Sequence, residues 1–361
     1  MKQRSHQITP ATAPACARVA VIGASGYTGA ELLRLLSQHP NVEITAATAD
    51  RSAGRTVGEV YPQLNRLKAL RLVKLNVAQL KRQADVAFVA LPPGESTKPV
   101  GQLLDAGLRV IDLGADFRLR DHRLYPEWYH WLHKAPERLT RSVYGLPEFH
   151  HDEIAGAQLV ANPGCYPTAV LLGLGPMLRR TIADRSAPLI IDAKSGLSGA
   201  GRSANLNFQL PEVHESLEAY QLGTHRHTPE IEQELSQLAG RAVTVTFIPH
   251  LIPMSRGLLA TIYVPLRAMV TAGQLHEWYG DDYAKAPFVH IREDGPANPK
   301  HVRGSNMCEI GLAVVARTRQ AVITSAIDNL GKGAAGQAVQ NLNLMLGWPE
   351  TLGLEQPGLI A

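Results

Sequence analysis

Short apolar runs dominate the first third of the chain, and each of them ends in a turn or loop. The predicted strands are residues 19–22, 42–47, 86–91 and 110–113, and apolar residues at helical spacing predict helices over 30–36 and 96–106. The runs are near-continuous rather than alternating, which indicates strands buried on both faces of a parallel sheet. The pattern therefore predicts an α/β Rossmann-type domain.

The pattern changes in the second half of the chain. Alternating or apolar runs recur at residues 189–193, 243–248, 258–264, 310–316 and 321–326, with few helical segments between the later ones. This predicts a second, α+β domain with a mostly antiparallel sheet. A last helix is expected over residues 335–346, with Val339, Leu342 and Leu346 on one face.

The turn after the first strand is rich in glycine. Its sequence, Gly23-Ala24-Ser25-Gly26-Tyr27-Thr28-Gly29, has the spacing GxxGxxG rather than the common GxGxxG. Between a strand and a helix, such a turn lets backbone N–H groups approach a pyrophosphate; the alternative is an ordinary turn. The expected cofactor contacts here are Gly23, Ser25, Gly26, Tyr27 and Thr28.

The segment after the second strand gives a mixed indication of the cofactor. Asp50 can accept the ribose hydroxyls of NAD, whereas Arg51 and Ser52 can hold the 2′-phosphate of NADP. We favour NADP, because an arginine makes charge-assisted bonds to a phosphate that would repel the aspartate. Pro92, at the end of another strand, is a further expected cofactor contact. Either Asp50 or Arg51 can instead be an exposed loop residue.

A turn between a strand and a helix carries the candidate nucleophile, Cys165. An apolar run ends at Ala161, Pro163-Gly164 breaks it, and a helix is expected over residues 168–178. Unpaired N–H groups and the helix dipole favour a thiolate at such a position, so a lowered thiol pKa is expected. The alternative, a buried inert cysteine, fits the surrounding prolines and glycine less well.

Two polar segments of the second half are candidate parts of the same site. Residues 194–202 form a Gly/Ser-rich turn that can offer donors to an anion: Ser195 and Gly196 are assigned to the cofactor, and Ser198, Gly199 and Arg202 to the substrate. His225 and His227 precede a helix signature, and we place His225 first and His227 second as the acid/base.

An arginine is expected to hold a free carboxylate of the substrate. Its planar fork can pair both carboxylate oxygens at once. The candidates are Arg118, Arg202 and Arg256, each in or beside a turn or strand end. Arg202 can hold a phosphate instead, and a surface position is the alternative for Arg118.

Composition narrows the class of protein. The chain has 361 residues, 45% of them hydrophobic, and its longest apolar runs are far shorter than a membrane helix needs. A net charge of +4 from scattered Lys and Arg suits a small anionic substrate and gives no case for nucleic acid. Three distant cysteines indicate a reducing, cytoplasmic compartment without a disulfide framework or a metal site, and residues 1–17 are expected to form a disordered extension.

Taken together, these motifs resemble the N-acetyl-gamma-glutamyl-phosphate reductase family, which is related to aspartate-semialdehyde dehydrogenases. The matching segments are residues 23–29, 112–118, 144–148, 162–168, 195–202, 225–231 and 326–333, spread over nearly the whole chain. Pro163-Gly164-Cys165-Tyr166-Pro167-Thr168 combined with His225 to Ile231 is the most specific pair. Residues 1–17 and Asp50-Arg51 depart from the family pattern.

The resemblance implies reduction of an acyl phosphate by NADPH to a semialdehyde, with a thioester formed on Cys165. It implies that the C-terminal helix packs on the nucleotide domain and that Asn329 lies near the cofactor. The expected division is an NADP-binding domain of residues 18–164 and 328–361 and a catalytic, substrate-binding and oligomerisation domain of residues 165–327. A homodimer or homotetramer is expected.

Two other functions stay open from sequence alone. A catalytically inactive NADP-binding regulator would be expected to lack the cysteine or the histidines, and both are present. A lysine-pathway reductase of an aminoadipyl phosphate on a carrier protein differs in the substrate by one methylene. An electropositive surface for an acidic carrier would indicate that second alternative.

Overall fold

The computed structural model describes residues 13–180, 182–184, 187–202 and 210–360. Most of the expected extension, residues 1–12, lies outside the described residues. Of the remainder, the Pro14 carbonyl accepts a hydrogen bond of 2.8 Å from the Trp348 indole, and the first strand begins at Ala17. The described end of this segment is therefore attached to the C-terminal part of the chain.

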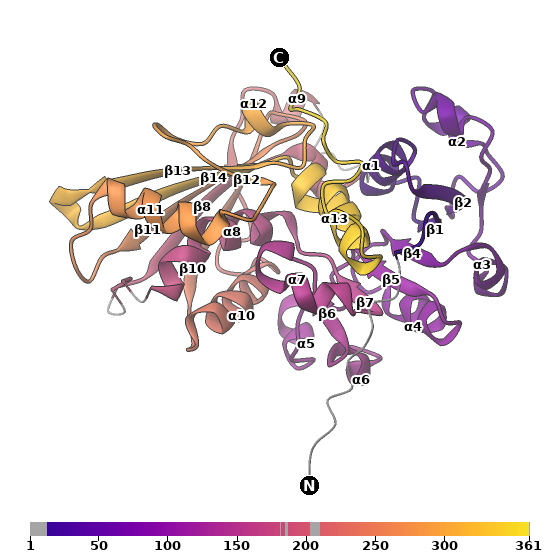
Figure 1. The fold of residues 1–361 in the computed structure, drawn as a ribbon, viewed down its shortest axis with the longest axis horizontal. Coiled ribbons are helices and arrows are strands. Elements are labelled where there is room, and N and C mark those ends of the chain that lie inside the picture. The colour runs from indigo at the N-terminus through magenta and orange to yellow at the C-terminus, as the bar shows by residue number, and fades with distance from the viewer. Residues whose placement is uncertain (1–12, 181, 185–186, 203–209, 361) are drawn as a thin grey trace, which may run out of the picture.

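The first sheet lies on the right in Figure 1. Within the described residues its strand order is β3 (Leu72–Val73), β2 (Val42–Thr48), β1 (Ala17–Ile22), β4 (Val86–Val89), β5 (Arg109–Asp112), β7 (Leu159–Ala161) and β6 (Ser142–Tyr144). All neighbouring strands pair in parallel, which confirms the Rossmann-type prediction. The order reverses between β1 and β4, so a ligand crevice is expected at their carboxyl ends.

Both faces of this sheet are covered. Val19 and Val21 of β1 belong to a buried cluster with residues of α1 (Tyr27–Leu36) and of α13 (Gly336–Met345). Ala20 and Ile22 belong to a second cluster with residues of α3 (Val77–Gln83) and α4 (Thr97–Asp105). The continuous apolar run of β1 thus reflects a strand with helices on both sides.

The second sheet is mixed. Its described strands run in the order β12 (Val289–Ile291), β13 (Cys308–Val315), β14 (Gln320–Ile327), β11 (Leu258–Pro265), β8 (Leu189–Gly196), β10 (Val245–Ile252) and β9 (Glu218–Ala219). The β8–β10 and β12–β13 pairs are parallel and the other pairs are antiparallel. The expected mostly antiparallel sheet is confirmed.

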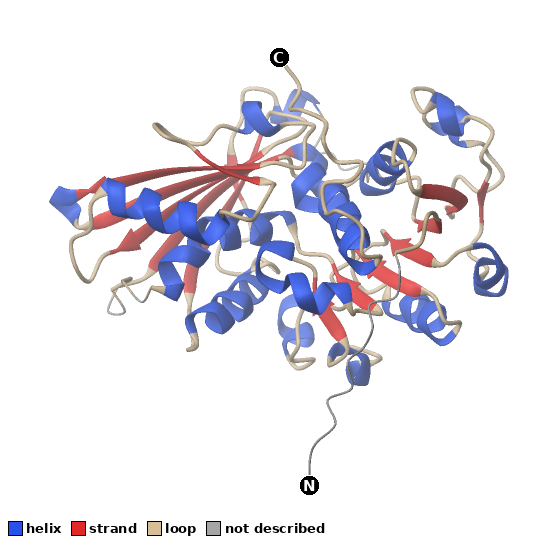
Figure 2. Cartoon of the chain, viewed as in Figure 1, coloured by secondary structure: helices blue, strands red, loops and turns tan. Residues whose placement is uncertain are grey.

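Helices cover one face of the second sheet (Figure 2). They are α8 (Cys165–Arg179), α10 (Thr228–Ala239) and α11 (Ala272–Tyr283). On β11, Ala260 and Ile262 are buried toward these helices, whereas Thr261 and Tyr263 alternate with them and keep partial exposure. Helix α11 was not expected, although its buried Leu275, Tyr279 and Tyr283 follow helical spacing.

Short elements complete the structure. The segment 121–139 contains α5 (Leu124–Tyr129) and α6 (Pro136–Leu139). The other short elements are α2 (Val57–Val60), η1 (Asn65–Leu67), α7 (Pro147–Ala155), η2 (Leu197–Ala200), α9 (Leu210–Val213), α12 (Pro299–Val302) and η4 (Ala316–Thr318). None of the helices in the described residues has the length and apolar character that a membrane crossing requires.

The C-terminal helix lies at the centre of the molecule (Figure 1). A π-helical turn, η5 (Gly331–Ala335), leads from β14 into α13, so the expected helix begins in a distorted turn. All of α13 is buried, including Gln337, Gln340, Asn341 and Asn343. The expectation of one apolar face was incomplete, because α1, α7 and η5 surround this helix.

A buried ion-pair cluster connects the two halves. The Arg256 guanidinium, before β11, donates to both carboxylate oxygens of Glu31 on α1 at 2.8 and 3.1 Å. It also donates to Asp328, after β14, at 3.0 to 3.2 Å. Burial acts to raise the pKa of Glu31, but hydrogen bonds from Arg34 and Arg256 outweigh it and lower that pKa.

We expect Arg256→Ala to lower the free energy of unfolding by about 3 kcal/mol, because it removes the cation between two buried carboxylates. Arg18→Ala is the control, since it breaks the exposed Arg18–Asp85 pair and should have a much smaller effect on the free energy of unfolding. Urea unfolding followed by circular dichroism measures both. Equal losses in the two variants would contradict this role for Arg256.

Candidate functional site

A cleft of about 1240 Å³ lies at the carboxyl ends of β1 and β4 and extends to the start of α8. It brings together most residues singled out from sequence: Gly23, Ser25, Gly26, Tyr27, Thr28, Asp50, Arg51, Ser52, Pro92, Arg118, Cys165, Ser198, Gly199, Arg202, His227 and Asn329. Within the described residues, Ser195, Gly196, His225 and Arg256 are not part of its lining.

The glycine-rich turn has the shape that a pyrophosphate requires. Gly23 has φ +79°, and a side chain there would collide with the Ala90 carbonyl. A side chain at Gly29 would collide with the Gly23 carbonyl. Gly26 caps α1 without a side-chain bond, so the first N–H groups of that helix stay available to an anion. These residues fit a dinucleotide.

The end of the cleft beside Arg51 and Ser52 carries more positive charge than the sequence predicted. Arg55 and Lys74 line it together with Arg51 and Ser52. Glu59 is also present, but its carboxylate accepts the Thr56 N–H in a capping box. Lys74 was missed because it follows β3, which reaches this place only by pairing beside β2. The cations favour a phosphorylated ribose.

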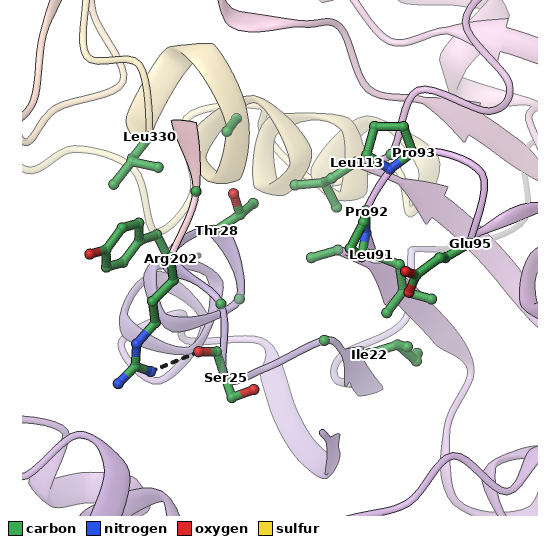
Figure 3. A pocket seen from close by; sticks show the side chains of 18 of the residues that line it. Ile22, Ser25, Thr28, Leu91, Pro92, Pro93, Glu95, Leu113, Arg202 and Leu330 are labelled. Carbon is green, nitrogen blue, oxygen red and sulfur yellow. Dashed lines mark hydrogen bonds between the residues drawn. The ribbon is translucent and has the colours of Figure 1, made fainter. Parts of the chain in front are cut away.

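Arg202 lies at the nucleotide end of the cleft. Its Nη1 donates to the Ser25 carbonyl at 2.8 Å and to the Tyr61 hydroxyl at 2.7 Å, as Figure 3 shows for Ser25. In the same view Pro92 lies across the pocket from this pair. Asn329 donates to the Ser198 hydroxyl at 2.9 Å and so fixes the turn before Arg202.

Besides His225, three residues expected in the site lie outside the lining of the cleft. Ser195 and Gly196 belong to β8; the Ser195 hydroxyl donates to the Gly196 carbonyl, and Gly196 is packed against the Met254–Arg256 backbone. Arg256 is occupied by Glu31 and Asp328 and cannot clamp a substrate carboxylate. Its partners are distant in sequence, so their pairing was not visible there.

Cys165 is the first residue of α8, three residues before the expected start at Thr168. Gly164 is the N-cap in extended conformation, and the Thr168 N–H and hydroxyl both bond to its carbonyl. A side chain at Gly333 would lie 2.8 Å from the Cys165 Cβ. The π-helical turn therefore packs directly against the cysteine.

Glu230 fixes the backbone before the cysteine. This fully buried carboxylate of α10 accepts the Gly164 N–H at 2.8 Å and the Tyr144 hydroxyl at 2.8 Å, and it lies 3.4 Å from Arg118 Nη1. Asn162 is held separately by Asn341, whose Nδ2 donates to it at 3.0 Å. The sequence indicated Glu230 only as part of the helix signature after His227 and assigned it no role in the site.

Arg118 is held by backbone carbonyls. Its Nε donates to Asn162 at 2.8 Å and its Nη2 to Leu113 at 3.0 Å. Although burial opposes the charge, Glu230 and neighbouring groups raise the pKa of Arg118. A side chain at Gly164 would lie 3.0 Å from Arg118 Nη1 and 2.5 Å from His227 Nε2. The Arg118 guanidinium and the His227 imidazole thus both pack against Gly164, the residue before Cys165.

The structure places the two histidines differently with respect to the cleft. His227 lines the cleft, whereas His225 Nδ1 accepts the His227 backbone N–H at 3.1 Å and its Nε2 lies 3.4 Å from the Tyr220 hydroxyl. Burial lowers the pKa of His225 to about 3. Burial, aided by His225 and Arg118, also lowers the pKa of His227. Both imidazoles are therefore neutral at pH 7.

The thiol of Cys165 differs from expectation. Burial raises its pKa to about 11, although Arg118 and the Tyr166 N–H act in the opposite direction. The predicted lowering was wrong because desolvation of the thiolate outweighs the helix terminus and the nearby cation. The Cys165 thiol and the His227 imidazole both line the cleft, and both are neutral at pH 7.

Arg226 is a site residue that the sequence analysis missed. It lies between the two buried histidines, but its own side chain is exposed and lines the cleft. The sequence signal that could have indicated Arg226 is its position between His225 and His227, because a residue between two inward-facing residues of a turn points outward. No group of three or more His, Cys, Asp and Glu in the described part of the chain could hold a metal ion.

A parallel nucleotide-binding sheet joined to a mixed sheet, with a cysteine at a helix start between them, defines the semialdehyde dehydrogenase class. The family model for the semialdehyde dehydrogenase NAD binding domain matches residues 18–157, and that for the dimerisation domain matches residues 165–329. Aspartate semialdehyde dehydrogenase II of Vibrio cholerae has the same fold, with a TM-score of 0.69 at 19% identity over 92% of this chain and 98% of that one.

Close relatives identify the family. N-acetyl-gamma-glutamyl-phosphate reductase of Moorella thermoacetica is 50% identical over 95% of this chain and 99% of its own length. That of Geotalea daltonii is 51% identical over 95% and 99%. The chain therefore belongs to the N-acetyl-gamma-glutamyl-phosphate reductase family.

Alkylation by iodoacetamide tests the raised pKa of Cys165. In a Cys16→Ser chain, which lacks the exposed thiol, the rate should rise about tenfold per pH unit from pH 7 to 9, because the thiolate fraction grows below a pKa of about 11. The cysteine of a short unstructured peptide, with a thiol pKa of about 8.5, should level off first. A plateau for Cys165 at pH 8 would show a preformed thiolate.

Proposed function

We propose that this chain reduces N-acetyl-γ-glutamyl phosphate with NADPH to N-acetyl-glutamate 5-semialdehyde and inorganic phosphate, a step of arginine biosynthesis. The observation that carries the proposal is one cleft with a dinucleotide-binding turn at one end and Cys165, His227 and Arg118 at the other. The names of relatives that are about 50% identical favour this substrate over an aminoadipyl one. The presence of Cys165 and His227 in the cleft disfavours an inactive regulator.

The proposed covalent step begins with the Cys165 thiol and the His227 imidazole both neutral. The Cys165 thiol gives its proton to His227 as sulfur attacks the acyl carbon, and the bond to the phosphate oxygen breaks with its electron pair leaving on phosphate. The product is a thioester on Cys165. The thioester is needed because an unactivated carboxylate could not accept hydride.

The second half of the reaction regenerates the thiol. NADPH, when bound by the glycine-rich turn, would supply a hydride for the thioester carbon, and Cys165 would then carry a hemithioacetal oxyanion. Collapse of the oxyanion to the aldehyde breaks the C–S bond, and the sulfur recovers its proton from the His227 imidazolium. The Gly164 N–H already donates to Glu230. The backbone N–H of Cys165 is therefore the hydrogen-bond donor that we propose for the oxyanion.

The residues proposed to hold NADPH are those of the glycine-rich turn, with Arg51, Ser52, Arg55 and Lys74 at the 2′-phosphate and Pro92 and Asn329 near the nicotinamide. The positive charge at the ribose end supports NADP over NAD. The need for a free thiol supports a reducing, cytoplasmic compartment.

We propose a homodimer formed through the open face of the second sheet, with a homotetramer as a further assembly. Ile190, Tyr263, Val322 and Ala313 lie side by side across four strands on this face. This row is at least partly exposed, although α12 and Ala297 cover another part of the same face, and an exposed apolar row of this kind is typical of a protein interface.

The reverse reaction tests the function. The chain should oxidise N-acetyl-glutamate 5-semialdehyde with NADP⁺ only when phosphate is present, followed by the absorbance of NADPH. Cys165→Ser should eliminate turnover, because the thioester cannot form, and Cys16→Ser should retain it. Faster turnover of aminoadipate semialdehyde, or substantial activity in Cys165→Ser, would overturn the proposal.

A further prediction separates the two histidines. His227→Ala should slow the chemical step by about 10²–10⁴-fold, the contribution of a general acid/base, and added imidazole should restore part of it. His225→Ala should have a smaller effect without rescue, since His225 only accepts the His227 N–H. Single-turnover kinetics measure both variants. Rescue of His225→Ala alone would assign the role to His225.

A further inference from the structure

A second cavity of about 470 Å³ adjoins the catalytic cleft. Its lining consists of Pro93, Glu127, Trp128, Tyr129, His130, Trp131, Gln221, Gly223, Thr224 and Arg226. Pro93 and Arg226 line the cleft as well, so the two spaces meet at these residues. The cavity combines aromatic rings, one arginine and several hydrogen-bonding groups.

Arg226 is the available cation near Cys165. Its backbone carbonyl accepts the Tyr129 hydroxyl at 3.4 Å, which holds the turn in place. In the part of the chain that the structure describes, its guanidinium makes no ion pair or hydrogen bond, unlike those of Arg118 and Arg202. It lines the same cleft as Cys165, and its charge acts to lower the pKa of that thiol.

The aromatic wall is rigid. Trp131 packs against Tyr125 at 4.8 Å and against Tyr129 and His133 at 5.9 Å between ring centroids. A side chain at Gly94 would lie 3.4 Å from Trp131 Nε1, so the indole also contacts the loop after β4. Such fixed rings offer flat faces to a planar amide.

We propose that this second cavity binds the non-reacting end of the substrate, an N-acylated α-amino acid: Arg226 pairs with its free carboxylate, and Trp131 packs on its acyl amide. The inference rests on the proposed function. It moves the carboxylate clamp from Arg118, Arg202 and Arg256 to a residue whose guanidinium is available.

The charges of the cavity define the chemical class. An acylated nitrogen is neutral, so the free carboxylate is the charged group that Arg226 can pair with. Glu127, the acidic residue of the lining, can accept the amide N–H of such a group. The cavity therefore offers a partner to each polar group at the non-reacting end of an acylamino carboxylate.

Three unreactive probes separate the two contacts. N-Acetylglutamate carries both the α-carboxylate and the acetamido group, 4-acetamidobutanoate lacks the α-carboxylate, and glutarate lacks the acetamido group. Binding to the full chain is measured by isothermal titration calorimetry. Arg226→Gln should weaken N-acetylglutamate and glutarate by about 10- to 100-fold and leave 4-acetamidobutanoate unchanged. Trp131→Leu should weaken the two acetamido probes several-fold and spare glutarate.

Controls separate this inference from the function itself. Arg123→Gln removes an exposed arginine of the same region, paired with Asp121, and should change none of the affinities. Binding of 2′,5′-ADP should be unchanged in every variant, which shows that each is folded. If the wild type neither binds N-acetylglutamate nor oxidises its semialdehyde, the proposed function fails and the subsite with it. If the wild type does both, but Arg226→Gln weakens all three probes equally or none, the subsite alone is overturned.

Discussion

The buried carboxylate of Glu230 is the interaction on which the geometry around Cys165 depends. It joins Gly164 before α8, Tyr144 on β6 and Arg118 after β5, so three segments of the first half are held by one residue of the second. A buried charge is costly unless it is hydrogen-bonded and paired, and here both conditions are met. The position of the cysteine is thereby fixed before any substrate arrives.

The features that could be predicted correctly from the sequence are those that depend on a local pattern of residues. The apolar strand, the glycine-rich turn and the break at Pro163-Gly164 each determine their own neighbourhood, so the parallel sheet and the cysteine elbow were found. Pairings between distant residues were not. Arg256 was wrongly placed at the substrate because Glu31 is 225 residues away, and Lys74 was missed because its place follows from strand order.

Electrostatics was the least predictable part of the site. A helix start beside an arginine favours a thiolate, but Cys165 is only partly exposed, with η5 packed against it, and burial raises the thiol pKa instead. Burial also keeps His227 neutral. Oxidation of cysteine proceeds through the thiolate, so a thiol that stays neutral at rest is also protected from oxidants until the proposed transfer of its proton to His227.

The return of α13 to the first sheet has a consequence for synthesis of the chain on the ribosome. Val19, Val21 and the inner face of α1 emerge early, yet the helix that covers them, residues 336–345, is translated almost last. At roughly 5–20 residues per second, that apolar face waits on the order of tens of seconds for its partner. The nascent β1–α1 unit therefore exposes an apolar surface, of the kind that chaperones bind, during this interval.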